Sequence, residues 1–143
     1  MKKILLAIVF CCGMNMVNAQ SAENNLPVLQ DSHHTVIGYV KGAGSIYDVN
    51  NALVFQLKND GTILNGEAKP MGYITADQAI QDRYHNTIGY LNGAGFEDGN
   101  HKPVGSVKND GSLVKNDNTV IGYEVNTEPM WAGLYFFYFM GKK

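Results

Sequence analysis

Apolar residues in this chain recur in short, evenly spaced clusters. The clearest cluster is Val36-Ile37-Gly38-Tyr39-Val40, and related clusters centre on positions 38, 55, 72, 89, 105 and 122. The steps between these positions are 17, 17, 17, 16 and 17 residues. Self-similarity at a short fixed period is typical of a supersecondary unit that buries its apolar face only by stacking on its neighbours. The sequence therefore predicts a repeat architecture.

Each repeat carries a turn signal six residues after its central position, at Gly44, Gly61, Gln78, Gly95 and Gly111. Two units contain Lys-Asn-Asp-Gly at this point, where Asn and Asp favour a tight turn and Gly supplies a left-handed conformation. The fourth unit is one residue short. Placing the gap just after Gly95 aligns Phe96 with Ile46, Ile63, Ile80 and Leu113 of the other units. The pattern predicts a series of β-hairpins.

Two apolar columns flank the central position, one residue before it and two residues after it. In a regular strand these columns would face opposite sides, whereas a bulge at the Gly-Tyr step would turn both to one side. Glycine holds the central position in five of the six copies, which fits a bulge or the close approach of another backbone. The sequence leaves this choice open.

The aromatic run at residues 134–139, Leu-Tyr-Phe-Phe-Tyr-Phe, is strongly β-prone and too short for a membrane helix. We expect it to be a strand that docks inside the domain, either closing the repeat array or crossing its middle. No segment has helical apolar spacing over the length that a helix needs. The predicted fold is therefore all-β, with five β-hairpin repeats of 17 residues in a closed ring or flower, completed by this C-terminal strand.

The beginning of the chain predicts export. Residues 1–19 have the basic start, apolar run and small final residue of a secretory signal peptide, and they contain both cysteines. We expect passage through the inner membrane to a periplasmic or secreted location. Residues 20–34 are polar and are predicted to be a flexible tail, and residues 35–143 are predicted to form a single β-repeat domain.

Charge limits the classes of partner. From Gln20 onward the chain has nine Lys and Arg residues against 13 Asp and Glu residues. This mild acidity argues against nucleic acid or an anionic membrane surface as partner, because both favour a basic face. We also expect that the chain does not span a membrane, while an oligomer is left open.

At this point the repeat can be compared with a known family. Units of Ile-Gly-Tyr-Val, a turn glycine six residues on, then Ile or Leu and Asp, resemble those of exported bacterial five-fold β-flower proteins over about residues 35–140. The resemblance implies a five-fold arrangement of hairpin petals and brings no functional residues with it. Two units depart from the pattern, with Phe55-Gln56 in place of Gly-Tyr and with Gln78 in place of the turn glycine.

The candidate ligand-binding residues form the column that follows the central position, namely Tyr39, Gln56, Tyr73, Tyr90 and Tyr123, with Ser106 at the sixth place. On a ring such a column becomes a circle of side chains that could stack on sugar rings and bond their hydroxyls. The alternative is that each tyrosine packs on the next petal, because Tyr is favoured in strands for packing alone.

Acidic residues form a second column at Asp48, Asn65, Asp82 and Asp98, joined by Lys115. Repeated oxygen ligands could hold Ca²⁺, but a single Asp or Asn at a strand end usually bonds the backbone of its own turn. The adjacent His33 and His34 lack further ligands at a fixed spacing. We therefore expect no metal and no cofactor.

An enzyme would need an acid and a base held at a defined distance in a cleft. The candidates are Glu97 and Asp98, with His85 and His101 nearby in sequence, and nothing in the sequence fixes such a pair. The leading hypothesis is a non-catalytic exported module that binds a glycan or a protein at the cell envelope. One alternative is an assembly module that uses the aromatic C-terminal segment for oligomer contacts, and a weaker one is a glycan-acting enzyme.

Overall fold

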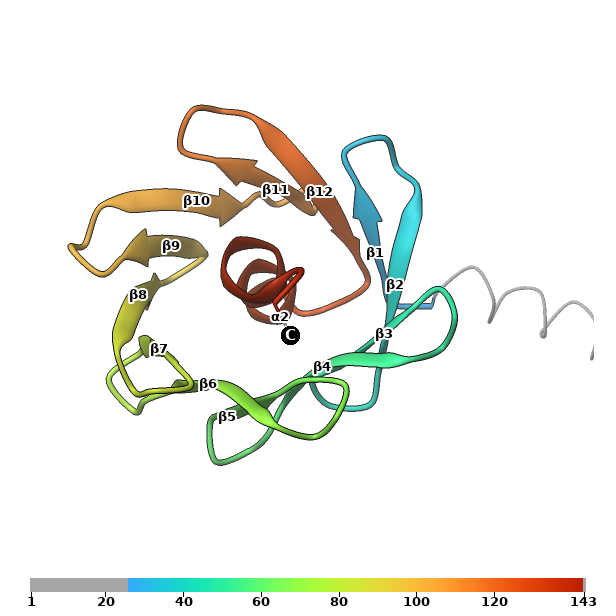
Figure 1. Ribbon diagram of the computed structural model, residues 1–143. Coiled ribbons are helices and arrows are strands. Elements are labelled where there is room, and N and C mark those ends of the chain that lie inside the picture. Colours follow the sequence, from blue (N-terminus) through green and yellow to red (C-terminus); the bar gives the residue numbers. More distant parts are fainter. Residues whose placement is uncertain (1–25, 143) are drawn as a thin grey trace, which may run out of the picture.

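Twelve antiparallel strands close into a ring around a short C-terminal helix in the computed structural model of the protein (Figure 1). The structure describes residues 26–142, so the predicted signal peptide and the start of the predicted tail lie outside the described residues. The predicted closed all-β ring of hairpin repeats is confirmed. The strands are β1 (Val28–Asp31), β2 (Val36–Lys41), β3 (Ser45–Asp48), β4 (Leu53–Leu57), β5 (Thr62–Leu64), β6 (Pro70–Ile74), β7 (Ala79–Asp82), β8 (Thr87–Asn92), β9 (Gly95–Asp98), β10 (Pro103–Val107), β11 (Ser112–Lys115) and β12 (Val120–Val125), followed by α2 (Pro129–Leu134) and the π-helical η1 (Tyr135–Phe139).

The five predicted repeat units are the strand pairs β2–β3, β4–β5, β6–β7, β8–β9 and β10–β11. The remaining first strand, β12, pairs with β1, which lies in the segment predicted as a flexible tail. That prediction was wrong for the described part of the segment. Leu29 and Asp31 stand 17 residues before Ile46 and Asp48, so β1 is a sixth copy of the second strand. The ring closes because β1 pairs with β12 on one side and β2 on the other.

Two kinds of turn alternate around the ring, at opposite ends of the strands. The Asp turns span residues 31–35, 48–52, 65–69, 82–86, 98–102 and 115–119. The Gly turns span residues 41–45, 58–62, 75–79, 92–95 and 108–112. Positive φ at Gly44, Gly61 and Gly111, and at Gln78 where glycine is lacking, confirms the predicted turn position in four units.

Each first strand bulges at the residue before its central position. In β10, Pro103 pairs with Glu97 and Gly105 pairs with Phe96, so Val104 is the extra residue. The same register shift recurs in the other five first strands. A bulge turns neighbouring side chains to one side, and both apolar columns pack on the core. The structure therefore contains the bulge that the sequence left open, one residue before the Gly-Tyr step.

The aromatic C-terminal segment is helical, so the predicted C-terminal strand was wrong. It crosses the middle of the ring, as one of the two predicted placements required (Figure 1). A strand there would find no free edge, because β1 already closes the ring, whereas a helix satisfies its own backbone groups. In η1 the Met140 N–H donates to the Tyr135 carbonyl at 2.6 Å. Within the described part of the chain, no helix has both the length and the apolar character needed to cross a bilayer.

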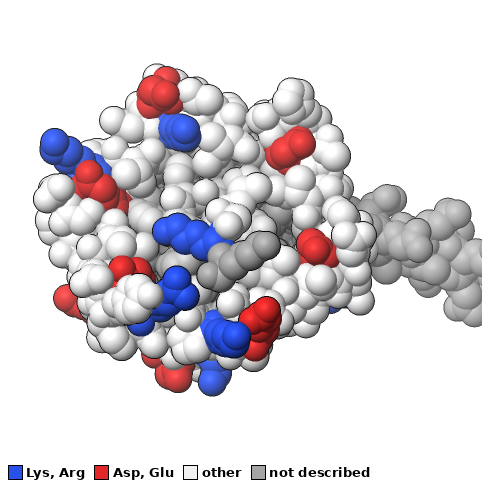
Figure 2. Space-filling view, viewed as in Figure 1, with Lys and Arg blue, Asp and Glu red and all other residues white. Residues whose placement is uncertain are grey.

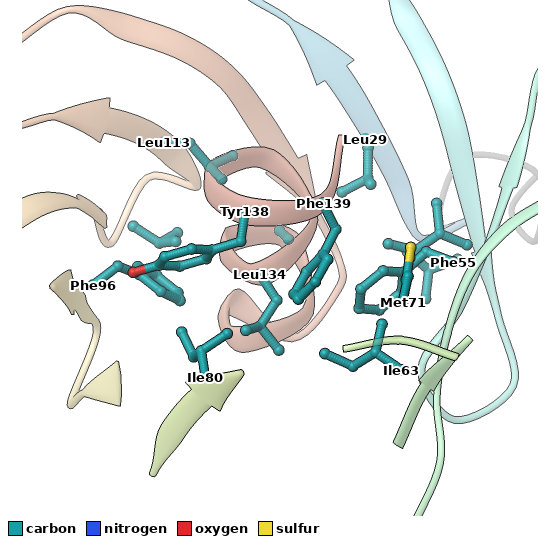
Figure 3. Packing of buried hydrophobic residues seen from close by; sticks show 14 residues of the cluster. Leu29, Phe55, Ile63, Met71, Ile80, Phe96, Leu113, Leu134, Tyr138 and Phe139 are labelled. Carbon is teal, nitrogen blue, oxygen red and sulfur yellow. The ribbon is translucent and has the colours of Figure 1, made fainter. Parts of the chain in front are cut away.

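The absence of helical periodicity in this segment has a physical cause. An amphipathic pattern marks a helix with one buried side and one solvated side. The ring surrounds α2 and η1, so their apolar side chains point toward several strands at once (Figure 3). A helix buried all round carries no polar stripe from which its period could be read.

The core lies between the helix and the inner side of the ring. Figure 3 shows Phe139 among Phe55, Ile63 and Met71, all from the inner side of the ring. One residue of each second strand is at most 2% exposed, namely Leu29, Ile46, Ile63, Ile80, Phe96 and Leu113. The predicted alignment of Phe96 with its counterparts is thereby confirmed.

Candidate functional site

The tyrosine column lies on the outer face of the ring. Each member comes directly after the central position of its strand. The apolar residues one before and two after that central position point into the core. Tyr39, Tyr73, Tyr90 and Tyr123 are all half-buried on this outer face. Gln56 and Ser106 occupy the same place on β4 and β10. The structure therefore brings the predicted ligand-binding residues onto one surface, distributed around the ring.

Three of the tyrosines stack on histidines, each in the Asp turn that follows the strand paired with the tyrosine's own strand. The ring centroids are 4.0 Å apart for Tyr123 and His34, 4.2 Å for Tyr73 and His85, and 4.0 Å for Tyr90 and His101, with interplanar angles of 15–20°. These tyrosines therefore pack within their own repeat unit and not on the next petal. The same contacts place two aromatic rings together at three points on the outer face.

The histidines form a column that the sequence analysis missed. His34, His85 and His101 occupy one position of their Asp turns and have φ between 61° and 66°. This position recurs as Asn51, Ala68 and Asn118 in the other turns. It recurs with the same 17-residue step as the tyrosine column, so the sequence spacing alone could have shown that the histidines form a column. What the spacing could not give is the stacking of each histidine on the tyrosine of the strand paired with the one that leads into its turn.

A hydrogen-bonding side chain stands beside each Tyr–His pair, on the strand that leads into the histidine turn. Gln30 pairs with Tyr123, Gln81 with Tyr73 and Glu97 with Tyr90 in the strand register. The His34 Nδ1 lies 3.4 Å from the Gln30 Oε1 atom, and the His101 Nδ1 lies 3.0 Å from the Glu97 Oε2 atom. Each cluster thus combines aromatic surface with an amide or a carboxylate.

Glu97 has the most developed electrostatic environment of the three. The Asn92 side-chain amide donates to its Oε1 atom at 2.8 Å, and this bond together with that from His101 lowers the pKa of the Glu97 carboxyl. The Glu97 side chain is 16% exposed, whereas that of His101 is 64% exposed. A carboxyl group that stays charged at neutral pH accepts hydrogen bonds but has no proton to donate, so Glu97 is a poor general acid.

The other two proposed acid/base residues bind other partners. The Asp98 carboxylate accepts the backbone N–H groups of Asn100 and Lys102 at 2.8 and 3.0 Å, so it is part of its own turn. His85 stacks on Tyr73 in a different hairpin. The structure therefore brings together only Glu97 and His101 of the four candidates.

The acidic column has the turn-forming role that the sequence favoured. In each of five Asp turns, one side-chain oxygen accepts two backbone N–H groups, two and four residues later, at 2.8–3.0 Å. The residues are Asp31, Asp48, Asn65, Asp82 and Asp98. Among residues 26–142, no group of three or more His, Cys, Asp and Glu side chains is placed to hold a metal ion.

Comparison with known proteins agrees with this geometry. A model of the family described as 5-fold beta-flower protein matches residues 27–140, which is most of the chain. The chain belongs to the 5-fold beta-flower protein family. No match was found among curated proteins or among solved structures.

The family match begins earlier than the resemblance seen in the sequence. It starts at residue 27, one residue before β1, and ends at Met140, which follows η1. Both elements that the sequence analysis assigned wrongly therefore fall inside the matched beta-flower region. The match gives the fold and assigns no functional residue.

Proposed function

We propose that this beta-flower protein is an exported, non-catalytic binding module whose outer face holds a glycan. The observation that carries the proposal is the set of three Tyr–His pairs, each beside a Gln or a Glu. Aromatic rings with an apolar body and polar edges, next to side chains that bond hydroxyls, match the chemistry of sugars. Their distribution around a ring suits a chain of several sugars.

The packed interior supports an external site. Leu134 is fully buried and Phe139 is 2% exposed inside the ring. A Cβ atom added at Gly72 or Gly89 would lie 2.7 Å from a ring atom of Phe139 or Tyr138. With the middle of the ring filled to this density, a ligand has to bind on the outside.

Two other functions receive less support. Assembly through the aromatic segment needs exposed aromatic side chains. Tyr138 and Phe139 are buried within the ring, and the three aromatic residues 135–137 are half-buried and pack against the core. A glycan-acting enzyme would need a second acid near Glu97, and Asp98 is bound into its own turn. Both alternatives therefore rank below binding.

Surface charge is consistent with a partner other than nucleic acid. Figure 2 shows Lys and Arg side chains near the middle of one face, with Asp and Glu side chains scattered around them. From Gln20 onward, the part proposed to be exported, the chain has nine Lys and Arg residues against 13 Asp and Glu residues. Nucleic acid binding is typically driven by a basic patch or stripe.

A thermal-shift screen of the chain from Gln20 onward, against neutral and acidic oligosaccharides, tests the proposal. A ligand that binds only the folded state raises the unfolding temperature in a concentration-dependent manner. We expect Tyr73→Val to weaken binding at one Tyr–His pair, because Val suits a strand but offers no aromatic face. The control is Tyr84→Val, which removes a tyrosine that is 71% exposed and lies outside the column.

The two variants also define the contrary result. The proposal fails when no oligosaccharide raises the unfolding temperature, or when Tyr73→Val binds as the unchanged protein does. Binding only to an envelope protein, without any glycan response, also contradicts it.

A further inference from the structure

A groove of about 270 Å³ crosses the outer face between β9, β10 and β11. Ser106 lies in its middle, because this residue pairs with Gly95 on β9 and with Val114 on β11. Asn92 and Glu97 contribute from β8 and β9, and Lys108, Lys115 and Asn116 contribute from the two turns that adjoin β10 and β11.

The groove exists because side chains are small at this point of the ring. The row Gly95, Ser106 and Val114 corresponds to Thr62, Tyr73 and Gln81 on the strands β5, β6 and β7. Elsewhere the middle of this row is a tyrosine or Gln56. Because Ser106 has no aromatic ring, a hollow is left here, whereas a larger side chain occupies the equivalent space in the other units.

The shortened fourth unit borders the same groove. The backbone N–H of Val107 donates to the Ala94 carbonyl at 3.1 Å. The equivalent acceptor is a residue with positive φ in the other four Gly turns, such as Gly44 for Leu57. Ala94, and not Gly95, thus holds the turn position. The predicted gap after Gly95 was wrong, because the missing residue lies within the turn itself.

Lys115 is a third departure from the repeat at this place. It stands where the other second strands end in Asp or Asn, and Asp117 accepts the Thr119 N–H of that turn instead. The carboxylates that lie within ion-pair distance of a cation among residues 26–142 belong to Glu67 and Glu97, and neither pairs with Lys108 or Lys115. Three deviations from the pattern therefore converge on one groove that contains two cations.

We propose that this groove binds a single sugar residue that carries a carboxylate, a uronate unit within a glycan. The inference rests on the proposed glycan-binding function and adds the position and the class of the sugar. Val114 and the backbone at Gly95 offer a floor for the C–H face of a pyranose, and Ser106, Asn92 and Asn116 offer partners for its hydroxyls. The ammonium groups of Lys108 and Lys115 match the carboxylate.

The size and the charge of the groove both favour this ligand. Its volume is just below the range of about 300–1,000 Å³ that is typical of pockets for drug-sized ligands, so it admits one ring and not several. The charges of Asp110 and Asp117 act on the two lysines, but within residues 26–142 neither carboxylate forms an ion pair with them. An acidic sugar would therefore add a direct ion pair that a neutral sugar cannot. The Glu97 carboxylate is already engaged by Asn92 and His101, which limits its repulsion of an acidic ligand.

Isothermal titration calorimetry with an oligogalacturonate and with a neutral oligosaccharide of equal length tests the inference. We expect the acidic probe to bind at least tenfold more tightly than the neutral one, and the difference to shrink at high salt. Ser106→Tyr should weaken acidic binding at least tenfold, because it fills the groove with the residue that four other units carry. The control Leu64→Tyr adds the same side chain to β5, where β3 has Tyr47 at the equivalent place.

Charge is tested with a matched pair of variants. Residues 58–61 and 108–111 are both Lys-Asn-Asp-Gly turns, but only the second borders the groove. Lys108→Gln should weaken binding of the acidic probe severalfold, whereas Lys58→Gln should not change it. Far-ultraviolet circular dichroism and urea unfolding establish that each variant folds.

Each contrary result has a distinct meaning. Equal affinity for the acidic and neutral probes overturns the inference, as does unchanged binding by Ser106→Tyr. When those results accompany lost binding in Tyr73→Val, the outer face still binds glycans and only the groove is excluded. When neither probe binds the unchanged protein and the wider screen is also negative, both the inference and the proposed function fail.

Discussion

The ring of Phe137 lies against the backbone of Gly105, where an added Cβ atom would be 2.4 Å from two ring carbons. The same contact occurs in three further pairs: Phe136 with Gly122, Tyr138 with Gly89, and Phe139 with Gly72. The aromatic residues run forward along the helix while their glycines run backward along the repeats. Successive residues of the helix thus face glycines one repeat apart. Four of the five glycines in the column therefore leave room for rings of the aromatic segment. At the place without a glycine, the ring centroid of Phe55 lies 5.9 Å from that of Tyr135.

Gly105→Ala should destabilise the fold by about 1–3 kcal/mol, because an overpacked core forces shifts of side chains and backbone. The Val114 carbonyl, 2.6 Å from the added Cβ, blocks an easy escape. Urea unfolding measures the change. Gly38→Ala is the matched control, since no helix ring lies among its nearest atoms, and an equal loss in both variants would contradict the account.

Phe139→Ala should lower the free energy of unfolding by about 3–5 kcal/mol, the usual cost of removing a large buried aromatic side chain. Phe139 is 2% exposed, whereas the next residue, Met140, is 47% exposed. Met140→Ala therefore serves as the control, with an expected change within about 0.5 kcal/mol. Similar values for the two variants in urea unfolding would show that the segment is not packed in the ring.

Asp98 should contribute to acid sensitivity. Backbone N–H groups of Lys102 and Asn100 donate to its carboxylate and lower its pKa below the ordinary Asp value. A lowered folded-state pKa gives stability that is present above the unfolded pKa and is lost as the pH falls through the folded pKa. Asp98→Asn keeps an acceptor, as Asn65 does, and should flatten this part of the profile.

The measurement for Asp98 is the unfolding temperature between pH 7 and pH 2. Asp98→Ala should be less stable than Asp98→Asn at pH 7, because alanine leaves the turn N–H groups without their acceptor. Identical pH profiles for the unchanged protein and Asp98→Asn would exclude this role.

Tyr138 should remain protonated in the folded protein well above pH 10. Burial, with a smaller effect from the charges of Asp98 and Glu97, raises the pKa of Tyr138 to about 12, and its hydroxyl donates to the Glu97 carbonyl at 2.6 Å. The sign is opposite to that of Asp98: this stability is complete below the unfolded pKa and is lost as the pH rises toward the folded pKa.

Absorbance titration of tyrosinate measures this effect. We expect Tyr138 and Tyr135, whose pKa burial also raises, to titrate later than the exposed tyrosines, and Tyr138→Phe to lower the amplitude of this late step by one tyrosine. The variant should also lose stability at pH 7, because the Glu97 carbonyl loses a partner. A late step of unchanged amplitude in Tyr138→Phe would contradict the assignment to Tyr138.

Local pattern was sufficient for most of the ring. The 17-residue step located five units, the turn positions and the buried column that includes Ile46 and Ile80, because each unit solves the same packing problem with the same residues. It also contained β1, since Leu29 and Asp31 repeat the spacing of the later strands. The residues around β1 are polar and its apolar run is short, so the pattern did not predict a strand there.

The candidate site was predictable only in part. The tyrosine column follows from sequence spacing, but its outer position depends on the bulge before each central position. The stacking of Tyr123 on His34 joins residues from opposite ends of the chain. Ring closure creates that contact. The groove at Ser106 likewise needs β9, β10 and β11 side by side before the missing ring becomes a hollow.

By itself the sequence determined the repeat, the turns and the columns, because these depend on residues within about one unit of each other. Tertiary structure decided the fate of the aromatic segment at residues 134–139. Its local preference is for a strand, yet the closed ring offers no edge to pair with, and only a helix supplies its own backbone hydrogen bonds in that apolar space. The glycine column then receives the rings that the helix presents.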